Sequence, residues 1–313
     1  MIHSLPVFFS VVVFNNLDNT IYFDDTNINS VIEGKYDYSK LNNKKKIIIL
    51  LSQSPYVISH IATYLIQNIN VPFVIITAMN DYTFPQELER VNSIKKIIHH
   101  KYFKHWFAIN KSIPNDNNFT TIPYGLNYWT LLNKPNFVEE IQSITEQDCK
   151  LVNITNHSQH FTNRIPKIYA NFHIKCTNHL DNQHTDLRHG NWRGRLHKII
   201  PPEIIYFEPT ILPRTQSWEK MSLYSFVLSP LGNGLDCIRT YEALCLGCIV
   251  IIQKSCLNHD SIYSDLPVLV VNEYSEINET LLKTTLELFS LKKFNYEKLY
   301  MNYWFNLVNQ KFT

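Results

Sequence analysis

Short apolar runs rich in β-branched and aromatic residues alternate with stretches of helical periodicity along most of this 313-residue chain. A continuous apolar run bounded by turn residues is typical of a buried strand, whereas apolar residues spaced three and four apart are typical of a helix. The pattern predicts nine strands, at Leu5–Phe14, Ile47–Leu51, Phe73–Thr77, Trp106–Ile109, Ile168–Phe172, Ile204–Phe207, Phe226–Ser229, Cys248–Ile252 and Val268–Val271. Strands that alternate with helices predict an α/β fold with doubly wound parallel sheets.

The helical stretches and the breaks between them divide the chain into two similar halves. Pro55 and Pro85 each open a predicted helix, because proline suits the first helical position. Further helices are predicted over Gln216–Leu223, Cys237–Leu246 and Tyr296–Val308, and the expected linker is Glu146–Pro166. We therefore expect an N-terminal domain over residues 1–150, a C-terminal domain over residues 151–295, and a helix in 296–313 that packs back on the N-terminal domain. Ligands of such sheets bind at the carboxyl ends of the strands.

Composition narrows the class of protein. A content of 45% hydrophobic and 13% aromatic residues suits a globular core. The net charge of +2 gives no electrostatic case for a nucleic-acid-binding protein. The apolar run Leu5–Phe14 is shorter than the roughly 20 residues that span a bilayer, and it lacks the flanks of a signal peptide. We therefore expect no transmembrane segment, a cytoplasmic location and reduced cysteines.

Glycine is scarce, and its distribution is informative. The chain has seven glycines, and their spacing fits neither GxGxxG nor GxxxxGK[ST]. A standard dinucleotide-binding turn, a Walker-type NTPase loop and a kinase phosphate loop are therefore excluded. Three of the seven lie between Gly232 and Gly247, within the segment Tyr224–Ile252.

This glycine-containing segment carries the candidate chemistry. A predicted strand runs through a loop with Gly232 and Gly234 into a helix, for which Asp236 is the expected N-cap. A helix N-terminus favours an anionic group such as a diphosphate. Arg239 and Glu242 are three residues apart and share a helical face, so Arg239 could bind a phosphate and Glu242 could accept hydrogen bonds from a ribose diol. The alternative is a capped helix with an ordinary surface ion pair.

The segment resembles the nucleotide-sugar-binding signature of exostosin-like glycosyltransferases, closest in pattern to those of large DNA viruses and some bacteria. It matches that signature at Pro230, Gly232, Gly234, Asp236, Arg239, Glu242, Ala243, Leu244 and Gly247. Three other blocks resemble the family in the same order along the chain, at Phe73–Pro85, His105–Leu131 and Lys167–Asn178. The likeness runs from about residue 47 to the last residue, and the glycine-containing segment is its most specific part.

The resemblance implies the GT-B fold, with two Rossmann-like domains facing a central cleft, and an inverting hexosyl- or pentosyltransferase. The enzyme would move a sugar from a UDP- or GDP-sugar to a glycan or glycoprotein acceptor, in the host cytoplasm if the protein is viral. No cofactor is expected, because the nucleotide sugar is a substrate, and no metal is expected, because the sequence has no DxD pair. The expected donor-binding residues are Asn171, Arg188, Asn233, Gly234, Asp236, Arg239 and Glu242. Asp81, in an acidic loop after a strand, is the expected general base.

Several alternatives stay open at this point. The family pattern has Asp and His where this chain has Asn127 and Trp129, which favours an inactive glycan- or nucleotide-binding relative as the second hypothesis. Asp81 could be a simple turn residue, and Arg193 and Arg195 are weaker phosphate-binding candidates because a basic run is usually a solvated face. Nucleic-acid binding through residues 188–198 is disfavoured by the charge balance. The set His173, Cys176 and His179 matches no closed zinc spacing.

Overall fold

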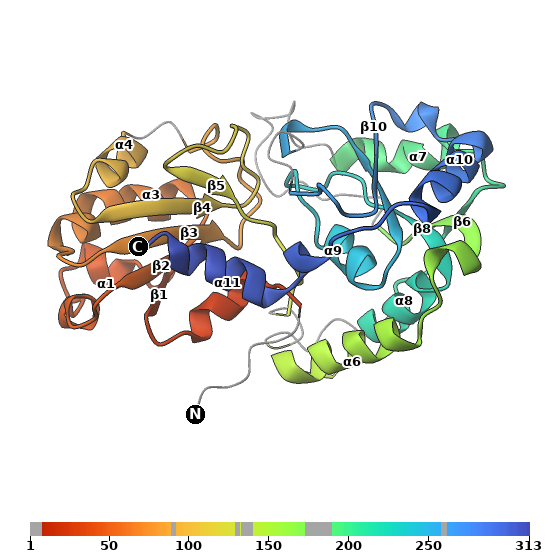
Figure 1. Ribbon diagram of the computed structural model, residues 1–313. Helices are drawn as coiled ribbons and strands as arrows, with labels where there is room; N and C mark the ends of the chain where they lie inside the picture. Colours follow the sequence, from red (N-terminus) through yellow and green to blue (C-terminus); the bar gives the residue numbers. More distant parts are fainter. Residues whose placement is uncertain (1–7, 89–91, 129–131, 133–139, 173–189, 258–261) are drawn as a thin grey trace. The chain divides into compact units, whose positions relative to one another are not determined.

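The computed structural model describes residues 8–88, 92–128, 132, 140–172, 190–257 and 262–313. These residues form two compact units (Figure 1). The N-terminal unit contains Ser10–Tyr124 and Asn302–Thr313. The C-terminal unit contains Gly125–Asn258 and Tyr263–Met301, together with Phe8 and Phe9. Each unit has one five-stranded parallel sheet flanked by helices, so the expected parallel α/β architecture is confirmed.

The sheet of the N-terminal unit has the strand order β1-β2-β3-β4-β5, with every neighbouring pair parallel. Its strands are β1 (Thr20–Phe23), β2 (Ile47–Ser52), β3 (Phe73–Ala78), β4 (Phe103–Ala108) and β5 (Phe119–Thr121). The helices are α1 (Asn29–Ile32), α2 (Ser39–Asn42), α3 (Pro55–His60), a π-helical turn (Ile61–Leu65), α4 (Ser93–Ile98) and most of α11 (Met301–Gln310). Every residue of β2 and β3 is buried, as expected of parallel strands covered on both faces.

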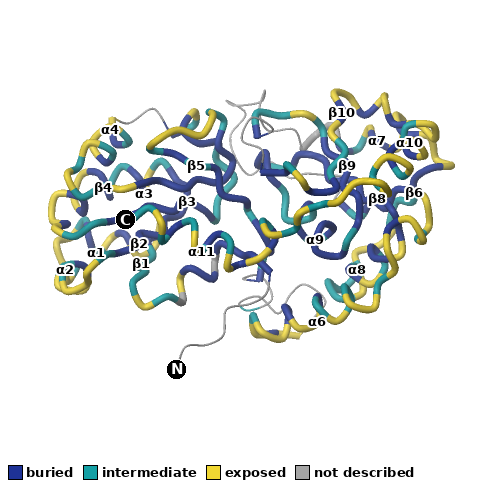
Figure 2. Tube along the Cα trace, in the orientation of Figure 1, coloured by how far each residue is buried: buried dark blue, intermediate teal, exposed yellow. Residues whose placement is uncertain are grey.

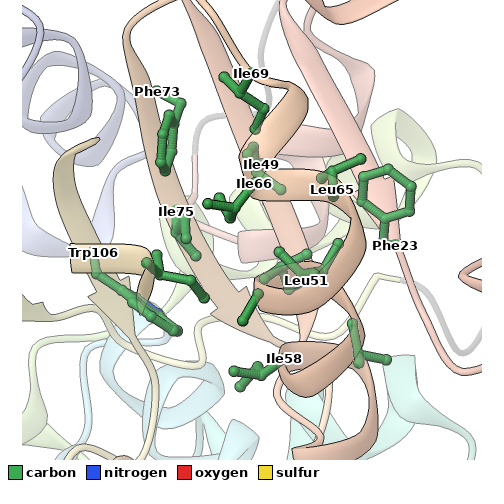
Figure 3. Close-up of a cluster of buried hydrophobic side chains, with 14 of the residues drawn as sticks. Phe23, Ile49, Leu51, Ile58, Leu65, Ile66, Ile69, Phe73, Ile75 and Trp106 are labelled. Atoms are coloured by element: carbon green, nitrogen blue, oxygen red, sulfur yellow. The ribbon is translucent and has the colours of Figure 1, made fainter. Parts of the chain in front are cut away.

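Side chains from the strands and the α3 segment form the core of the N-terminal unit (Figure 3). Ile49 and Leu51 of β2 and Ile75 of β3 are fully buried, and Ile58 and Leu65 of the helical segment belong to the same cluster. The continuous apolar run of each strand and the helical spacing of the α3 segment therefore meet in one hydrophobic layer.

The sheet of the C-terminal unit has the order β10-β9-β8-β6-β7, again with parallel pairing throughout. Its strands are β6 (Ile165–Ala170), β7 (Ile205–Phe207), β8 (Tyr224–Leu228), β9 (Ile249–Gln253) and β10 (Val268–Val271). The helices are α6 (Ile144–His157), α7 (Leu196–Ile199), α8 (Arg214–Met221), α9 (Ile238–Cys245) and α10 (Glu279–Ser290). The chain passes from β6 to β7 on one side and then crosses to β8 on the other, so the strand order reverses at β6. In open α/β sheets this switch point is where ligands bind.

Burial along the chain follows the two sheets. The tube in Figure 2 is dark along the inner strands β2 and β3 of one unit and β8 of the other, and it is exposed over much of α6 and α10. Among the described residues, no helix is both long and apolar enough to cross a membrane.

Two of the predicted elements in the N-terminal half are wrong. Val11–Asn16, within the expected first strand Leu5–Phe14, forms a 3-10 helix, and residues 5–7 lie outside the described part. A continuous apolar run does not distinguish a strand from a buried helical turn, and here Val11 and Phe14 are buried by the latter. Pro85 does not open a helix. Phe84 instead bridges to Lys111, and the next helix, α4, begins at Ser93.

The expected linker Glu146–Pro166 is also wrong, because most of it is helix α6. The helix begins with a capping box in which the Ser143 hydroxyl accepts from the Glu146 amide and the Glu146 carboxylate accepts from the Ser143 amide. The segment is rich in Asn and Thr, so its composition does not indicate a helix. Gln147, Asp148 and Leu151 are the buried residues of this helix. The compact units therefore divide after Tyr124, whereas the division expected at residue 150 falls inside α6.

The end of the chain returns to the N-terminal unit. A 3-10 turn (Glu297–Leu299) precedes α11, and the residues from Asn302 onwards belong to that unit. The Lys46 ammonium lies 3.0 Å from the Asn309 side-chain oxygen and 4.7 Å from the centre of the Phe312 ring. Val308 is fully buried, so this segment contributes to the packing of the unit.

Candidate functional site

The carboxyl ends of β6 and β8 bring together several of the C-terminal residues that the sequence pattern predicts to bind a donor. Asn171 and Phe172 follow β6 directly, and the loop from Ser229 to Cys237 joins β8 to α9. The Gly232 amide donates to the Gly234 carbonyl across 3.1 Å, which closes a tight turn at the centre of this loop. A Cβ atom at Gly232 would lie 3.0 Å from the Arg193 guanidinium, so the absence of a side chain lets the arginine approach.

Arg239, in the first turn of α9, is held at the switch point. Its Nε donates to the Asn171 side-chain oxygen at 2.7 Å, and its guanidinium lies 5.6 Å from the centre of the Phe172 ring. Asn171 is oriented in turn, because its Nδ2 donates to the Ser217 hydroxyl at 2.6 Å. Burial lowers the pKa of Arg239, and the positive charge of Arg193 also lowers it. Arginine keeps its proton in such surroundings, so the site carries a partly desolvated positive charge.

Arg193 is the second guanidinium at this point, although the sequence pattern makes it a weaker candidate. It is 7% exposed and belongs to a 3-10 segment, Gly190–Arg195. Its Nε donates to the Leu231 carbonyl at 2.8 Å and its Nη2 to the Pro230 carbonyl at 3.1 Å. Its guanidinium is 5.8 Å from the centre of the Phe172 ring.

Two arginines therefore contact one aromatic ring, and neither forms an ion pair with a carboxylate in the described part of the chain. Removing a charge from water is costly unless an opposite charge compensates it. We call the group formed by Phe172, Arg193 and Arg239 the arginine pair site. Its two positive charges, beside the N-terminus of α9, suit an anion such as a phosphate or diphosphate.

Asp236 does not have the capping role that we expected at the N-terminus of α9. Cys237, not Asp236, is the N-cap of α9, so the predicted cap is wrong. The Asp236 carboxylate is buried and accepts hydrogen bonds from the Cys237 amide at 2.9 Å, the Tyr241 hydroxyl at 2.6 Å and the Tyr263 hydroxyl at 2.9 Å. Burial raises the pKa of both tyrosines well above its usual value. The carboxylate thus fixes the end of the loop to α9 and to the segment around Tyr263.

Glu242 lies one helical turn beyond Arg239 and has another partner. Its Oε1 is 3.6 Å from Nε of Arg214, and both side chains are mostly buried. Arg214 also donates to the Asn127 carbonyl at 2.5 Å and to the Gln147 side-chain oxygen at 3.2 Å. Among the described residues, Arg239 and Glu242 form no ion pair with each other.

The remaining predicted donor-binding residues have different outcomes. Asn233 and Gly234 lie in the loop after β8, where the Gly234 carbonyl closes the turn. Arg188 lies outside the described residues, as do Trp129 and the histidine and cysteine set His173, Cys176 and His179. Phe172 is not selected from the sequence. It contacts two arginines that come from distant segments of the chain. An aromatic residue after a strand does not by itself indicate a binding site.

Asp81 lies at the carboxyl edge of the other sheet, in the N-terminal unit. It follows β3 after Met79, which has a positive φ of 62°, and it is half-buried. Gln53, just beyond β2, donates to the Tyr82 carbonyl at 2.5 Å and to the Ile109 carbonyl at 2.9 Å. One side chain therefore joins the loops that follow β3 and β4. Backbone in the left-handed region is costly for a residue with a side chain, and such positions cluster at functional sites.

The described histidine, cysteine and carboxylate side chains were candidates for metal binding or acid–base chemistry. No group of three or more His, Cys, Asp or Glu side chains is placed to bind a metal ion among the residues that the structure describes. His105 is buried in β4, with Nδ1 3.1 Å from the Asn117 carbonyl and Nε2 2.8 Å from the Thr120 hydroxyl. Burial lowers the pKa of His105 to about 4, so the ring is neutral near pH 7.

Comparison with known proteins adds no assignment to this geometry. No protein-family model matches the chain, and no curated protein sequence matches it significantly. A function for this chain therefore has to be inferred from the arginine pair site, from the Asp81 loop and from the sequence pattern that points to both.

Proposed function

We propose that this protein is a GT-B glycosyltransferase that transfers a sugar from a UDP- or GDP-sugar to a glycan acceptor with inversion. The observation that carries the proposal is the arginine pair site, where Arg193 and Arg239 lack a carboxylate partner among the described residues. It lies at the switch point of a doubly wound sheet, where such folds bind ligands. The resemblance of the segment to nucleotide-sugar signatures supports the diphosphate of a nucleotide sugar as the anion.

In this proposal the C-terminal unit holds the diphosphate of the donor. Arg239 and Arg193 neutralise its charge, which grows as the bond to the sugar breaks, and the first amides of α9 add hydrogen bonds. The loop around Gly232 and Gly234 lets the backbone approach the phosphates closely. Asn171 and Phe172 keep the Arg239 guanidinium in place before the donor binds.

The N-terminal unit supplies the base. The Asp81 carboxylate takes the proton of the acceptor hydroxyl while that oxygen attacks the anomeric carbon from the face opposite the leaving group. The bond between the anomeric carbon and the phosphate oxygen breaks, and the nucleoside diphosphate leaves with the electron pair. One displacement with one base inverts the anomeric centre.

Calorimetry with UDP and GDP tests the donor site. Arg239→Ala and Arg193→Ala should each weaken binding at least about tenfold, because a charge-assisted contact contributes about 1.5–3 kcal/mol. Arg195→Ala is the matched control, because Arg195 is exposed in the same 3-10 segment. Thermal melting shows whether each variant folds. Unchanged affinity in both folded variants would rule out the proposed donor site.

A transfer assay with a panel of nucleotide sugars tests Asp81. Asp81→Asn should abolish sugar transfer and keep donor affinity, since the amide cannot accept the proton. Transfer by this variant at the wild-type rate would assign the base elsewhere.

The second candidate function is a non-catalytic nucleotide- or glycan-binding relative. Two observations favour it. Glu242, which we expected to bind the ribose, forms an ion pair with Arg214 instead. The chain also has Asn127 where the family pattern has Asp. Nucleotide binding that depends on Arg239, with neither transfer nor donor hydrolysis across the panel, would support it.

A further inference from the structure

A series of hydrogen-bonded side chains connects the arginine pair site to the end of β7. The Arg239 Nε donates to the Asn171 Oδ1 at 2.7 Å, and the Asn171 Nδ2 donates to the Ser217 hydroxyl at 2.6 Å. Ser217 is hydrogen-bonded in turn to Tyr169, whose hydroxyl donates to the Glu208 Oε2 at 3.1 Å. We call Asn171, Ser217, Tyr169 and Glu208 the polar network. It joins β6, α8 and α9 to the residue that follows β7.

The end of the polar network away from Arg239 is shielded from water. Tyr169 is fully buried, and the Glu208 side chain is 4% exposed. Burial raises the pKa of Tyr169, the Glu208 charge raises it further, and the hydrogen bond from Ser217 acts in the opposite direction. The Tyr169 hydroxyl therefore keeps its proton near pH 7. Water does not compete for these groups, so their hydrogen bonds hold one arrangement.

The hydrogen bonds of the polar network run in one direction. A carboxylate only accepts, so the Tyr169 hydrogen points to Glu208 and the Tyr169 oxygen accepts from Ser217. The Ser217 oxygen accepts from the Asn171 amide nitrogen, which leaves the amide oxygen facing Arg239. A guanidinium only donates, so the opposite orientation of Asn171 would set one N–H group against another. The carboxylate after β7 therefore determines which end of the amide faces the arginine.

Lys220 balances the charge of that carboxylate. Its Nζ lies 2.6 Å from the Glu208 Oε2 and donates to the Tyr206 hydroxyl at 3.2 Å. Glu208 thus sets the direction of the network, while its negative charge is compensated by Lys220 and not by Arg239. The Arg239 guanidinium is held in place and keeps its own charge for a ligand.

We propose that Ser217, Tyr169 and Glu208 are positioning residues of the arginine pair site. They hold the Asn171 amide with its oxygen toward Arg239, so the guanidinium is already in place when an anion binds. Ordering the arginine beforehand lowers the entropic cost of binding. The consequence for donor binding rests on the proposed function, whereas the placement of Arg239 can be tested without a ligand.

Calorimetry on the full chain with inorganic diphosphate and UDP tests this role. Tyr169→Phe and Ser217→Ala each interrupt the network and should weaken the binding of both ligands about two- to tenfold, the effect of one hydrogen bond. Ser217→Thr keeps the hydroxyl and should keep the wild-type affinity. Tyr206→Phe and Gln216→Ala are the matched controls, because Tyr206 stacks on Tyr169 from outside the network and Gln216 is exposed beside Ser217 on α8. Thermal melting shows whether each variant folds.

Two further measurements separate positioning from a general loss of structure. In an Arg239→Ala background, Tyr169→Phe should cause no additional loss of affinity, because the network acts through that guanidinium. Proton NMR of the Arg239 Nε–H, identified by its absence in Arg239→Ala, needs no ligand. Its exchange with water should be faster in Tyr169→Phe and Ser217→Ala than in the wild type or Tyr206→Phe.

The outcomes separate this role from the proposed function. Unchanged affinity in both folded network variants, or unchanged Nε–H exchange, overturns the positioning role and leaves the arginine pair site standing. A loss of affinity that persists in the Arg239→Ala background also overturns it, since the effect would not pass through Arg239. If the wild type binds neither ligand, the proposed donor site fails, and the Nε–H exchange alone decides whether the network holds Arg239.

Discussion

Asp236 belongs to the glycine-containing sequence motif, but its contacts are structural. Its carboxylate accepts from one amide and two tyrosine hydroxyls, and it is 5% exposed. A buried carboxylate with three donors holds the groups around it in one arrangement. We therefore assign it the positioning of the loop after β8, which contains Gly232 and Gly234.

His105 makes the stability of the N-terminal unit depend on pH. Its folded pKa of about 4 lies below the ordinary value of 6.5, so the unfolded chain takes up a proton in this range and the native ring does not. The stabilisation is complete above pH 6.5 and is lost as the pH falls towards 4. Urea unfolding should therefore show a loss of about 2 kcal/mol between pH 7 and pH 5 that is absent in His105→Gln.

The control for this pH dependence is His157→Gln, because His157 is exposed on α6. It should keep the wild-type dependence. The same loss of stability in His105→Gln as in the wild type would show that His105 is not its source.

At the scale of elements, two glycines have the same left-handed backbone conformation but different surroundings. They therefore distinguish the cost of backbone strain from the cost of overpacking. Gly34 has a φ of +69°, and a Cβ atom added there would meet open space. Gly125 has a φ of +71°, but a Cβ atom there would lie 2.7 Å from the Phe9 carbonyl oxygen. That carbonyl also accepts the Leu126 amide, so it has little freedom to move.

Gly34→Ala should cost about 1–2 kcal/mol, the cost of a left-handed conformation for a residue with a side chain. Gly125→Ala should cost about 1–3 kcal/mol more, because an overpacked site adds its own strain. Chemical denaturation of both variants measures the difference. Equal losses would mean that the contact with Phe9 relaxes without cost.

The elements differ in how far the sequence determines them. The apolar pattern predicts β2, β3 and β9 to within one residue at each end, because each is a continuous β-branched run bounded by polar or turn residues. It does not predict β1, since the four residues of that strand are mostly half-buried and give no clear alternation. The Asn and Thr content of α6 hides that helix, although its capping box is visible in the sequence as Ser143 and Glu146.

The residues of the candidate site also differ in how far the sequence predicts them. Arg239 can be predicted because it is three residues beyond Asp236, on a helix that follows a glycine-containing loop. The contacts of Arg193 with Pro230 and Leu231 join segments 37 and 38 residues apart. Local pattern cannot specify such contacts, because they depend on the order of strands in the sheet.

At the scale of the whole molecule, each unit has its own sheet and core, and α11 joins the end of the chain to the first of them. Val308→Ala removes fully buried methyl groups and should destabilise the N-terminal unit by about 1–2 kcal/mol. Hydrogen exchange should become faster in β2 and β3 and stay unchanged in β8 and β9. Asn306→Ala, at an exposed position of the same helix, is the control. Faster exchange confined to β8 and β9 would contradict this division into units.

The return of the chain at residues 302–313 also affects the order of events during synthesis. These residues emerge from the ribosome only after the entire C-terminal unit, although they complete the N-terminal one. At about 5–20 residues per second, translation of the intervening segment of roughly 180 residues takes on the order of 10–35 seconds. Throughout that interval the first unit lacks the side chains of Trp304 and Val308, and its uncovered apolar surface is available to a chaperone.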